Sequence, residues 1–239
     1  MDDEKTRWRW RWIAGAIPLL LAVTAFVGWR LYEPGWRYGV RGVDVSHHQG
    51  AIDWFALAAD DVDFAYIKAT EGGDWLDPRF DENWSESHDA GVVRGAYHYF
   101  TLCRPGVEQA KNFIDVVPVE AGMLPPAVDL EFAGNCAHRP EVQAFLAELG
   151  DFLDIVGEHY DTPLLVYTNS GFYEAYLESD PPQVIWWINS PVLEPRGEPD
   201  WSFWQYFPGR GDGVHGEIDR NVYRGSPEEL RLLYVAPSD

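Results

Sequence analysis

The sequence predicts an α/β fold: an irregular TIM-like barrel of five β/α units followed by three β-strands, preceded by one N-terminal transmembrane helix. Two observations predict the barrel. Short apolar runs alternate with helical patterns from residue 41 onward, and three strand-like runs near the C-terminus leave no room for helices between them. Eight strands suffice to close a small barrel. A third observation, an uncharged apolar segment near the N-terminus, predicts the membrane helix.

The first 40 residues divide into three parts. Residues 1–11 form a charged tail, and the segment from Trp12 to Trp29 contains no Asp, Glu, Lys or Arg and has tryptophan at both ends. We therefore expect a transmembrane helix or signal anchor over 12–30, a linker over 31–40, and the barrel domain over 41–237 on the periplasmic or extracellular side. The alternative is a cleaved signal peptide, for which Val23-Thr24-Ala25 offers small residues.

The barrel domain is strongly acidic. The whole chain has a formal charge of −21, and residues 42–239 carry 11 Lys or Arg against 35 Asp or Glu. Such a domain repels nucleic acid, and it contains no basic stripe with interleaved aromatics, so we exclude nucleic-acid binding. The many tryptophans suit both a core and stacking against sugar rings.

The expected elements follow in order. Strands are expected at 42–46, 64–70, 93–100, within 125–132, and at 164–169, 184–189, 203–206 and 217–221. Helices are expected near Asp53 and over 79–90, 105–117, 142–156, 171–177 and 227–234. The clearest is 142–156, where seven apolar residues share one face and predict packing against a sheet.

The stretch from Pro125 to Phe132 places two carboxylates on alternate positions of an apolar run. Because strand side chains alternate, Asp129 and Glu131 point to one side while their apolar neighbours point to the other. The prolines argue against a helix, and the residues that follow are typical of a loop. The two acids therefore lie at the carboxyl end of a strand, where parallel α/β proteins build their sites.

Three further carboxylates fall at strand ends: Asp44 on the first strand, Glu71 just after the second and Asp219 on the eighth. In a barrel these ends ring one mouth, so we expect the acids to meet there. Like charges in a partly desolvated site cannot all ionise easily, so at least one should carry a proton near neutral pH. Glu71 has a second interpretation, as a structural partner of Lys68 or of a backbone amide.

The two cysteines, Cys103 and Cys136, each follow a predicted strand end. We expect them to face each other across neighbouring loops and to form a disulfide, which implies an oxidising compartment. The alternative is two unpaired thiols.

Two adjacent histidines, His47 and His48, suggest a metal-dependent hydrolase as an alternative. Adjacent histidines point in different directions, however, and the one other histidine near a strand end is His98, so we expect no metal. His47 is expected to form a hydrogen bond at the barrel mouth instead.

Seven short motifs occur in order along the barrel domain: 42–47 (GVDVSH), 66–72 (YIKATEG), 95–100 (GAYHYF), 129–131 (DLE), 167–169 (YTN), 204–206 (WQY) and 218–221 (IDRN). Together they resemble the glycoside hydrolase family 25 lysozymes over about residues 41–223. The sequence departs from the family pattern at His48, at 186–191 and at Arg220, which concerns the sugar subsites rather than the acid pair. Of Trp186 and Trp187, at most one is expected to reach the cleft.

The resemblance implies an N-acetylmuramidase that cleaves the β-1,4 bond between N-acetylmuramic acid and N-acetylglucosamine in peptidoglycan. It implies that Glu131 is the general acid and Asp129 the second carboxylate of the pair, with Asp44 and Asp219 lining the same cleft. We expect a monomer without a cofactor or metal. The residues expected around the substrate are Tyr97, Tyr167, Trp204, Gln205 and Glu71.

The position of Asp129 beside Glu131 makes it a poor candidate for attack from the opposite side of the sugar ring. We therefore expect a substrate-assisted route, in which the 2-acetamido oxygen attacks and Asp129 orients it. An inverting route, with Asp44 or Asp219 activating water, is the alternative. A membrane-tethered glycan-binding barrel without turnover is an alternative of another class.

Overall fold

The computed structural model describes residues 17–24, 28, 37–197 and 199–236. The chain divides into two compact units, Met1–Arg37 and Tyr38–Asp239. Residues 17–24 of the first unit are helical. Most of the predicted transmembrane segment, 12–30, lies outside the described residues and stays a prediction; within them, no helix has the length and apolar character needed to cross a bilayer.

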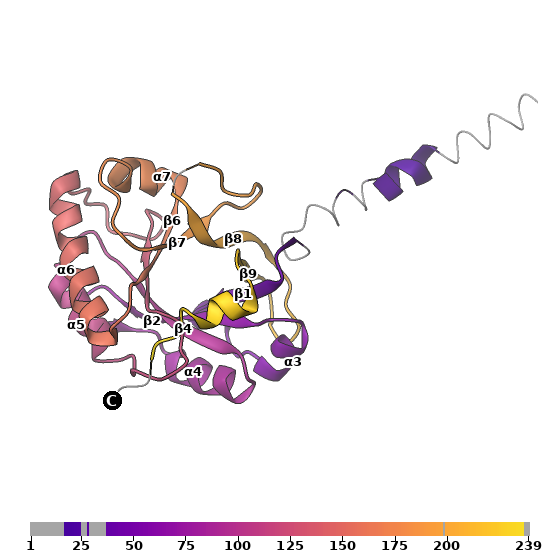
Figure 1. Cartoon of the computed structure of the whole chain (residues 1–239), viewed down its shortest axis with the longest axis horizontal. Coiled ribbons are helices and arrows are strands. Elements are labelled where there is room, and N and C mark those ends of the chain that lie inside the picture. The colour runs from indigo at the N-terminus through magenta and orange to yellow at the C-terminus, as the bar shows by residue number, and fades with distance from the viewer. Residues whose placement is uncertain (1–16, 25–27, 29–36, 198, 237–239) are drawn as a thin grey trace, which may run out of the picture. The chain divides into compact units, whose positions relative to one another are not determined.

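The second unit is a closed barrel with helices packed outside it, as Figure 1 shows. In the described part of the chain one sheet runs in the order β1-β9-β8-β7-β6-β5-β4-β2-β3, and an additional pairing of β1 with β2 closes the ring. The expected five β/α units and three final strands are thus confirmed, and the short β3, which pairs with β2, is an additional strand that was not expected. The strands are β1 (Val40–Val45), β2 (Phe64–Glu71), β3 (Trp75–Leu76), β4 (Val93–Tyr99), β5 (Ala127–Leu130), β6 (Leu165–Asn169), β7 (Ile185–Asn189), β8 (Trp201–Gly209) and β9 (Ile218–Tyr223).

The last strand runs against its neighbours. The pairings from β1 through β2 and β4 to β8 are parallel, but β9 is antiparallel to both β8 and β1. The expectation that Asp219 lies at the carboxyl end of its strand is therefore wrong: it is the second residue of β9. Because the strand is reversed, its beginning lies at the mouth, and Asp219 pairs in register with Asp44 of β1.

Helices cover the outside of the ring, and their positions follow the apolar periodicity of the sequence. The long helix α6 presents Phe145, Leu149, Phe152 and Val156 to the core, as predicted. The last helix ends at Arg231, earlier than the expected 234. The helical elements are η1 (His47–Gln49), α3 (Trp54–Ala59), α4 (Phe80–Asp89), α5 (Gly106–Ile114), α6 (Val142–Tyr160), α7 (Ser170–Phe172), the π-helical turn η2 (Tyr173–Leu177) and α8 (Pro227–Arg231).

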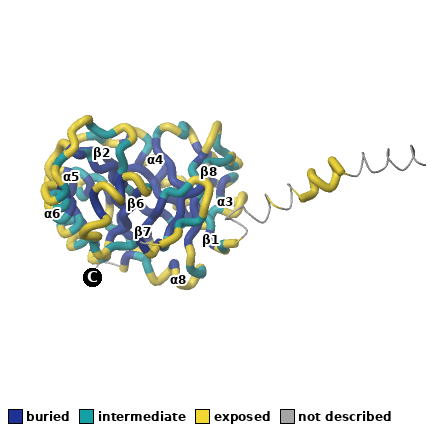
Figure 2. The backbone as a smooth tube through the Cα atoms, turned by 90° about the horizontal axis from the view of Figure 1, so that it is seen from above, coloured by how far each residue is buried: buried dark blue, intermediate teal, exposed yellow. Residues whose placement is uncertain are grey.

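Aromatic rings fill the inside of the barrel, which forms a second core beneath the mouth. Tyr66 and Trp187 lie with ring centroids 4.9 Å apart, and Phe203 packs edge-on to Tyr66 at 6.0 Å. Gly95 faces this filling, because a Cβ there would lie 2.5 Å from Cε1 of Tyr66. Figure 2 shows the buried backbone concentrated in the strands. The barrel is therefore closed by side chains below, and a site must lie at its mouth.

Candidate active site

A cavity of about 470 Å³ lies at the mouth of the barrel. Its wall brings together the four carboxylates Asp44, Asp129, Glu131 and Asp219, which come from three separate strands and the residue that follows one of them. The predicted residues Glu71, Tyr97, Tyr167 and Gln205 line the same cavity. The structure thus collects eight of the nine predicted catalytic and substrate residues in one place; the ninth is Trp204.

The acid pair on β5 has the predicted orientation. Asp129 and Glu131 both line the cavity, while Val128 and Leu130 are fully buried in the core between sheet and helices. Because β5 ends at Leu130, Glu131 lies just beyond the strand and is less buried than Asp129. Because side chains alternate along the strand, the apolar residues are buried in the core, while one deeply buried and one less buried carboxylate line the cavity.

Asp129 is buried, as Asp44 is. Its Oδ1 is buried and has no hydrogen-bond partner among the described residues. Burial first, and then the charge of Glu131, raise the pKa of Asp129 well above its ordinary value, although Lys68 opposes them. Burial also raises the pKa of Glu131, where Lys68 again opposes and Asp219 adds to the rise. Two neighbouring acids with raised pKa values can share a proton near neutral pH.

Asp44 is held by two amide donors. Gln205 Nε2 donates to Asp44 Oδ2 at 2.8 Å, and Asn221 Nδ2 donates to the same oxygen at 2.7 Å. Burial, followed by the charge of Asp219, raises the pKa of Asp44 to about 7, and the two amides lower it. The amides are themselves oriented, because Tyr167 OH donates to Gln205 Oε1 at 2.8 Å and Trp187 Nε1 donates to Asn221 Oδ1 at 2.8 Å.

Lys68 brings a positive charge into this acidic cavity. Its Nζ donates to Glu71 Oε2 at 2.7 Å and lies 4.7 Å from the ring centroid of Tyr99 and 5.0 Å from that of Trp75. Glu71 is therefore both a lining residue and the structural partner of Lys68 that the sequence offered as its second interpretation. The lysine stabilises negative charge on Asp129 and Glu131, which limits how far burial can neutralise them.

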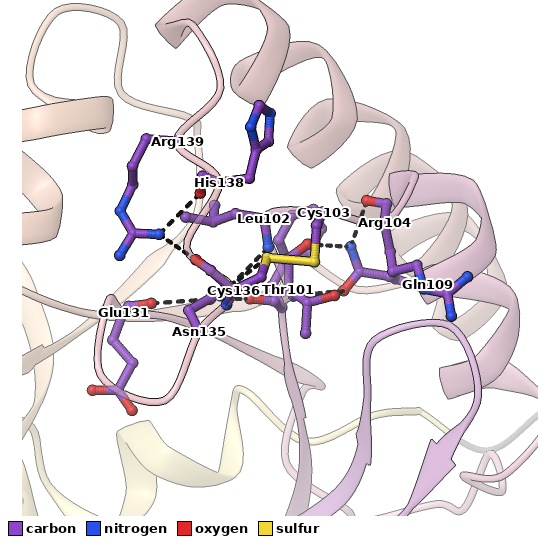
Figure 3. Close-up of a disulfide and its surroundings, with 11 residues drawn as sticks. Thr101, Leu102, Cys103, Arg104, Gln109, Glu131, Asn135, Cys136, His138 and Arg139 are labelled. Carbon is purple, nitrogen blue, oxygen red and sulfur yellow. Dashed lines mark hydrogen bonds between the residues drawn. A yellow bond between two sulfur atoms is a disulfide. The ribbon is translucent and has the colours of Figure 1, made fainter.

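The loop that carries Glu131 is joined to the loop after β4, as Figure 3 shows. Asn135 Nδ2 donates to the carbonyl oxygens of Phe100, at 2.8 Å, and of Glu131, at 3.0 Å, while Asn135 Oδ1 accepts from the Leu102 amide at 2.9 Å. The expected disulfide between Cys103 and Cys136 is confirmed, with Cα atoms 6.4 Å apart. The backbone of Glu131 is thus fixed by contacts outside its own strand.

The structure does not bring Trp204 into the cavity. Because Gln205 faces inward, its neighbour Trp204 faces outward, where it is buried against Tyr38 and Trp201. Its Nε1 donates to the Ser190 carbonyl at 2.8 Å. The tryptophan that lines the cavity is Trp187, whereas Trp186 packs against Tyr173 in the outer core. This agrees with the expectation that at most one of the pair would reach the cleft.

Sequence reasoning missed several lining or supporting residues. Asn221 lies two positions after Asp219 on the same strand and therefore on the same face, so the alternation of strand side chains alone could have identified Asn221. Asn135 and Tyr99 needed the folded chain, because their roles depend on contacts between distant segments.

His47 is hydrogen-bonded at the barrel mouth, as expected. Its Nδ1 lies 2.9 Å from Asp77 Oδ2. Across the described residues, no group of three or more His, Cys, Asp or Glu is arranged to hold a metal ion.

The mouth of this β/α barrel holds carboxylates of raised pKa between tyrosine and tryptophan rings. These are the groups that glycoside hydrolysis requires. The model of the family "Glycosyl hydrolases family 25" matches residues 43–209. The chain belongs to this family and is a glycoside hydrolase of the lysozyme and muramidase type.

Known relatives agree in sequence and in fold. Lysozyme M1 of Streptomyces globisporus is 32% identical over 221 residues, which cover 85% of this chain and 74% of the relative. The structure of a family 25 glycosyl hydrolase from Bacillus anthracis is 35% identical, with a TM-score of 0.77, and the match covers 82% of this chain and 94% of that one. A bacterial lysozyme from Streptomyces coelicolor is 31% identical, with a TM-score of 0.73, covering 81% and 96%.

The raised pKa of Asp44 predicts how the stability of the protein depends on pH. Since the pKa rises from 3.8 to about 7 on folding, the folded state keeps a proton that the unfolded chain has lost, and stability falls as pH rises through that window. We expect the free energy of unfolding of Asp44→Asn, relative to that of wild type, to be roughly 2–3 kcal/mol higher at about pH 8 than at about pH 5, because the amide cannot ionise. Urea unfolding at both pH values measures this gain.

The matched control is Asp154→Asn on the exposed side of α6. Its stability relative to wild type is expected to stay the same at both pH values. A stability difference for Asp44→Asn that does not grow with pH would contradict the raised pKa.

Proposed function

We propose that this enzyme cleaves the β-1,4 bond between N-acetylmuramic acid and N-acetylglucosamine in peptidoglycan, with Glu131 as the general acid. The observation that carries the proposal is the pair Asp129 and Glu131, which face one acid-lined cavity at the end of β5 with raised pKa values. The names of relatives support the substrate, since they include a lysozyme and an N,O-diacetylmuramidase.

Glu131 suits the role of proton donor. Cleavage of a glycosidic bond needs an acid that protonates the leaving oxygen, and a raised pKa lets an acid keep its proton to a higher pH. Glu131 is less buried than Asp129 and lies just past the strand end, where a bound glycan can reach it. The contacts of Asn135 fix its backbone and therefore restrict where the carboxyl group can lie.

Asp129 suits the orientation of the substrate's own acetamido group. Asp129 lines the cavity, where its carboxylate can accept the acetamido N–H of the sugar at the cleaved bond. The acetamido oxygen then attacks C1, the bond from C1 to the leaving oxygen breaks, and Glu131 gives that oxygen its proton. Water, deprotonated by Glu131, afterwards opens the cyclic intermediate, so two displacements retain the anomeric configuration.

An inverting route would use Asp44 or Asp219 to activate water directly. Both carboxylates line the cavity, and the pKa of each is raised by burial. In Asp44, however, Oδ2 already accepts two amide hydrogen bonds, whereas Oδ1 of Asp129 accepts none from the described residues. Since the amides of Gln205 and Asn221 hold Asp44 in place, Asp129 is the better candidate for the group that contacts the sugar.

The enzyme is further proposed to act outside the cytoplasm, attached to the membrane through residues 12–30. The support is the uncharged stretch between Trp12 and Trp29 together with the disulfide, which forms in oxidising compartments. The proposed substrate, peptidoglycan, also lies outside the cytoplasm.

Substitution of the general acid tests the function directly. We expect Glu131→Gln in the full chain to lower kcat on purified peptidoglycan by about three orders of magnitude, since proton transfer typically contributes about 10²–10⁴-fold. Glycan affinity should stay nearly the same, because glutamine has the same shape. Mass spectrometry of the released muropeptides identifies the bond that is cut, and reducing-end assays give the rate.

Glu158→Gln, on the exposed side of α6, is the matched control and should leave the rate unchanged. On a muramidase substrate with a good leaving group, Glu131→Gln should lower the rate much less, since such a leaving group departs without being protonated. Wild-type rates for the variant on peptidoglycan would remove Glu131 from its proposed role.

The configuration of the fresh product separates the two routes. We expect proton NMR of the first turnovers to show the β-anomer, because the acetamido route retains configuration. Asp129→Asn should slow the reaction without changing the anomer. A net inverted α-anomer would falsify the acetamido route and assign water activation to Asp44 or Asp219.

A further inference from the structure

A second hollow, of about 750 Å³, opens at the carboxyl ends of β6 and β7. The turn η2, loop residues within 190–196 and Pro199 form its other walls. Its lining includes the amides of Asn169 and Asn189 and the charged side chains of Glu174, Glu178 and Arg196.

This hollow lies beside the catalytic cavity, along the same two strands. β6 and β7 run parallel, with Tyr167 beside Trp187 and Asn169 beside Asn189. The first pair lines the catalytic cavity, and the second pair, two residues further along the same faces, lines the second hollow. Two residues of a strand span about 7 Å. A substituent on a sugar bound in the catalytic cavity can therefore reach the second hollow.

The chemistry of the lining differs from that of a sugar platform. Among its described residues the one aromatic side chain is Tyr173, which is buried, whereas sugar rings are bound against exposed aromatic faces. Glu174 on η2 and Glu178, which directly follows it, are exposed, and among the described residues of the lining the cation is Arg196. Carboxylates in excess over one guanidinium favour a ligand that carries an amine together with a carboxylate.

We propose that the second hollow binds the peptide stem of peptidoglycan, with Glu174 and Glu178 pairing with the side-chain amine of its diamino acid. The inference rests on the proposed function, because muramic acid carries this peptide on its lactyl group, next to the bond that is cut. Arg196 pairs with a carboxylate of the same peptide. The enzyme therefore prefers glycan strands that still carry their stems over strands that have lost them.

The test compares two tetrasaccharides of the same glycan repeat, one carrying stem tripeptides that end in a diamino acid and one stripped of its stems by an amidase. With the full-length wild type we expect KM to be about fivefold lower for the substrate with stems. The double variant Glu174→Gln/Glu178→Gln should remove this advantage and leave kcat, and KM for the stripped substrate, unchanged. Acetylation of the stem amine should have the same effect on the wild type.

The double variant Asp154→Asn/Glu158→Gln removes two carboxylates of the same spacing from the exposed side of α6 and should change neither KM. The peptide site is overturned if Glu174→Gln/Glu178→Gln changes KM equally for both substrates, or if the wild type has the same KM for both.

Failure of the proposed function has a different signature, in which the wild type cuts neither substrate. Calorimetry with a muramyl tripeptide then still decides the inference. Binding that Glu174→Gln/Glu178→Gln weakens supports the site, and binding that is absent or unaffected by the variant overturns it.

Discussion

The rest of the site depends on one constraint: several carboxylates lie together in a hollow that is too desolvated for all of them to be charged. Asp129 has a buried oxygen without a partner among the described residues, and the pKa of Asp44 is raised although two amides donate to its Oδ2. Lys68 offsets part of this repulsion. The fold tolerates such a destabilising cluster because the barrel beneath it is filled with aromatic rings and the loops around it are joined by Asn135 and a disulfide.

The antiparallel direction of the last strand places side chains in the site that a regular, all-parallel β/α barrel would not place there. Because β9 is antiparallel to β1 and β8, its beginning lies at the mouth, and Asp219 reaches the cavity from opposite the acid pair at the end of β5. Asn221 thereby contacts Asp44, although the two are 177 residues apart in the chain. Closure of the ring between β1 and β9 is thus part of the electrostatics of the site as well as of its architecture.

Features that depend on local periodicity could be predicted from the sequence. The stripe of α6, the strands up to β7 except the short β3, and the shared face of Asp129 and Glu131 all follow from periods of 3.6 and 2 residues. Features that depend on closure could not: the direction of β9 is set by its partners, so the position of Asp219 within its strand was predicted wrongly. Trp204 illustrates a neglected rule, since Gln205 and its neighbour cannot both face the cavity.

The central claim is that Glu131 keeps its proton while Asp129 releases its own to receive the acetamido group. Carbon NMR titration of both carboxyl groups, with and without an N-acetylglucosamine oligomer, tests it most directly. The account predicts that Glu131 titrates above its ordinary pKa of 4.5 in both states, and that the pKa of Asp129 falls when the sugar binds. A Glu131 pKa at or below the ordinary value, or an Asp129 that stays protonated with sugar bound, would contradict it.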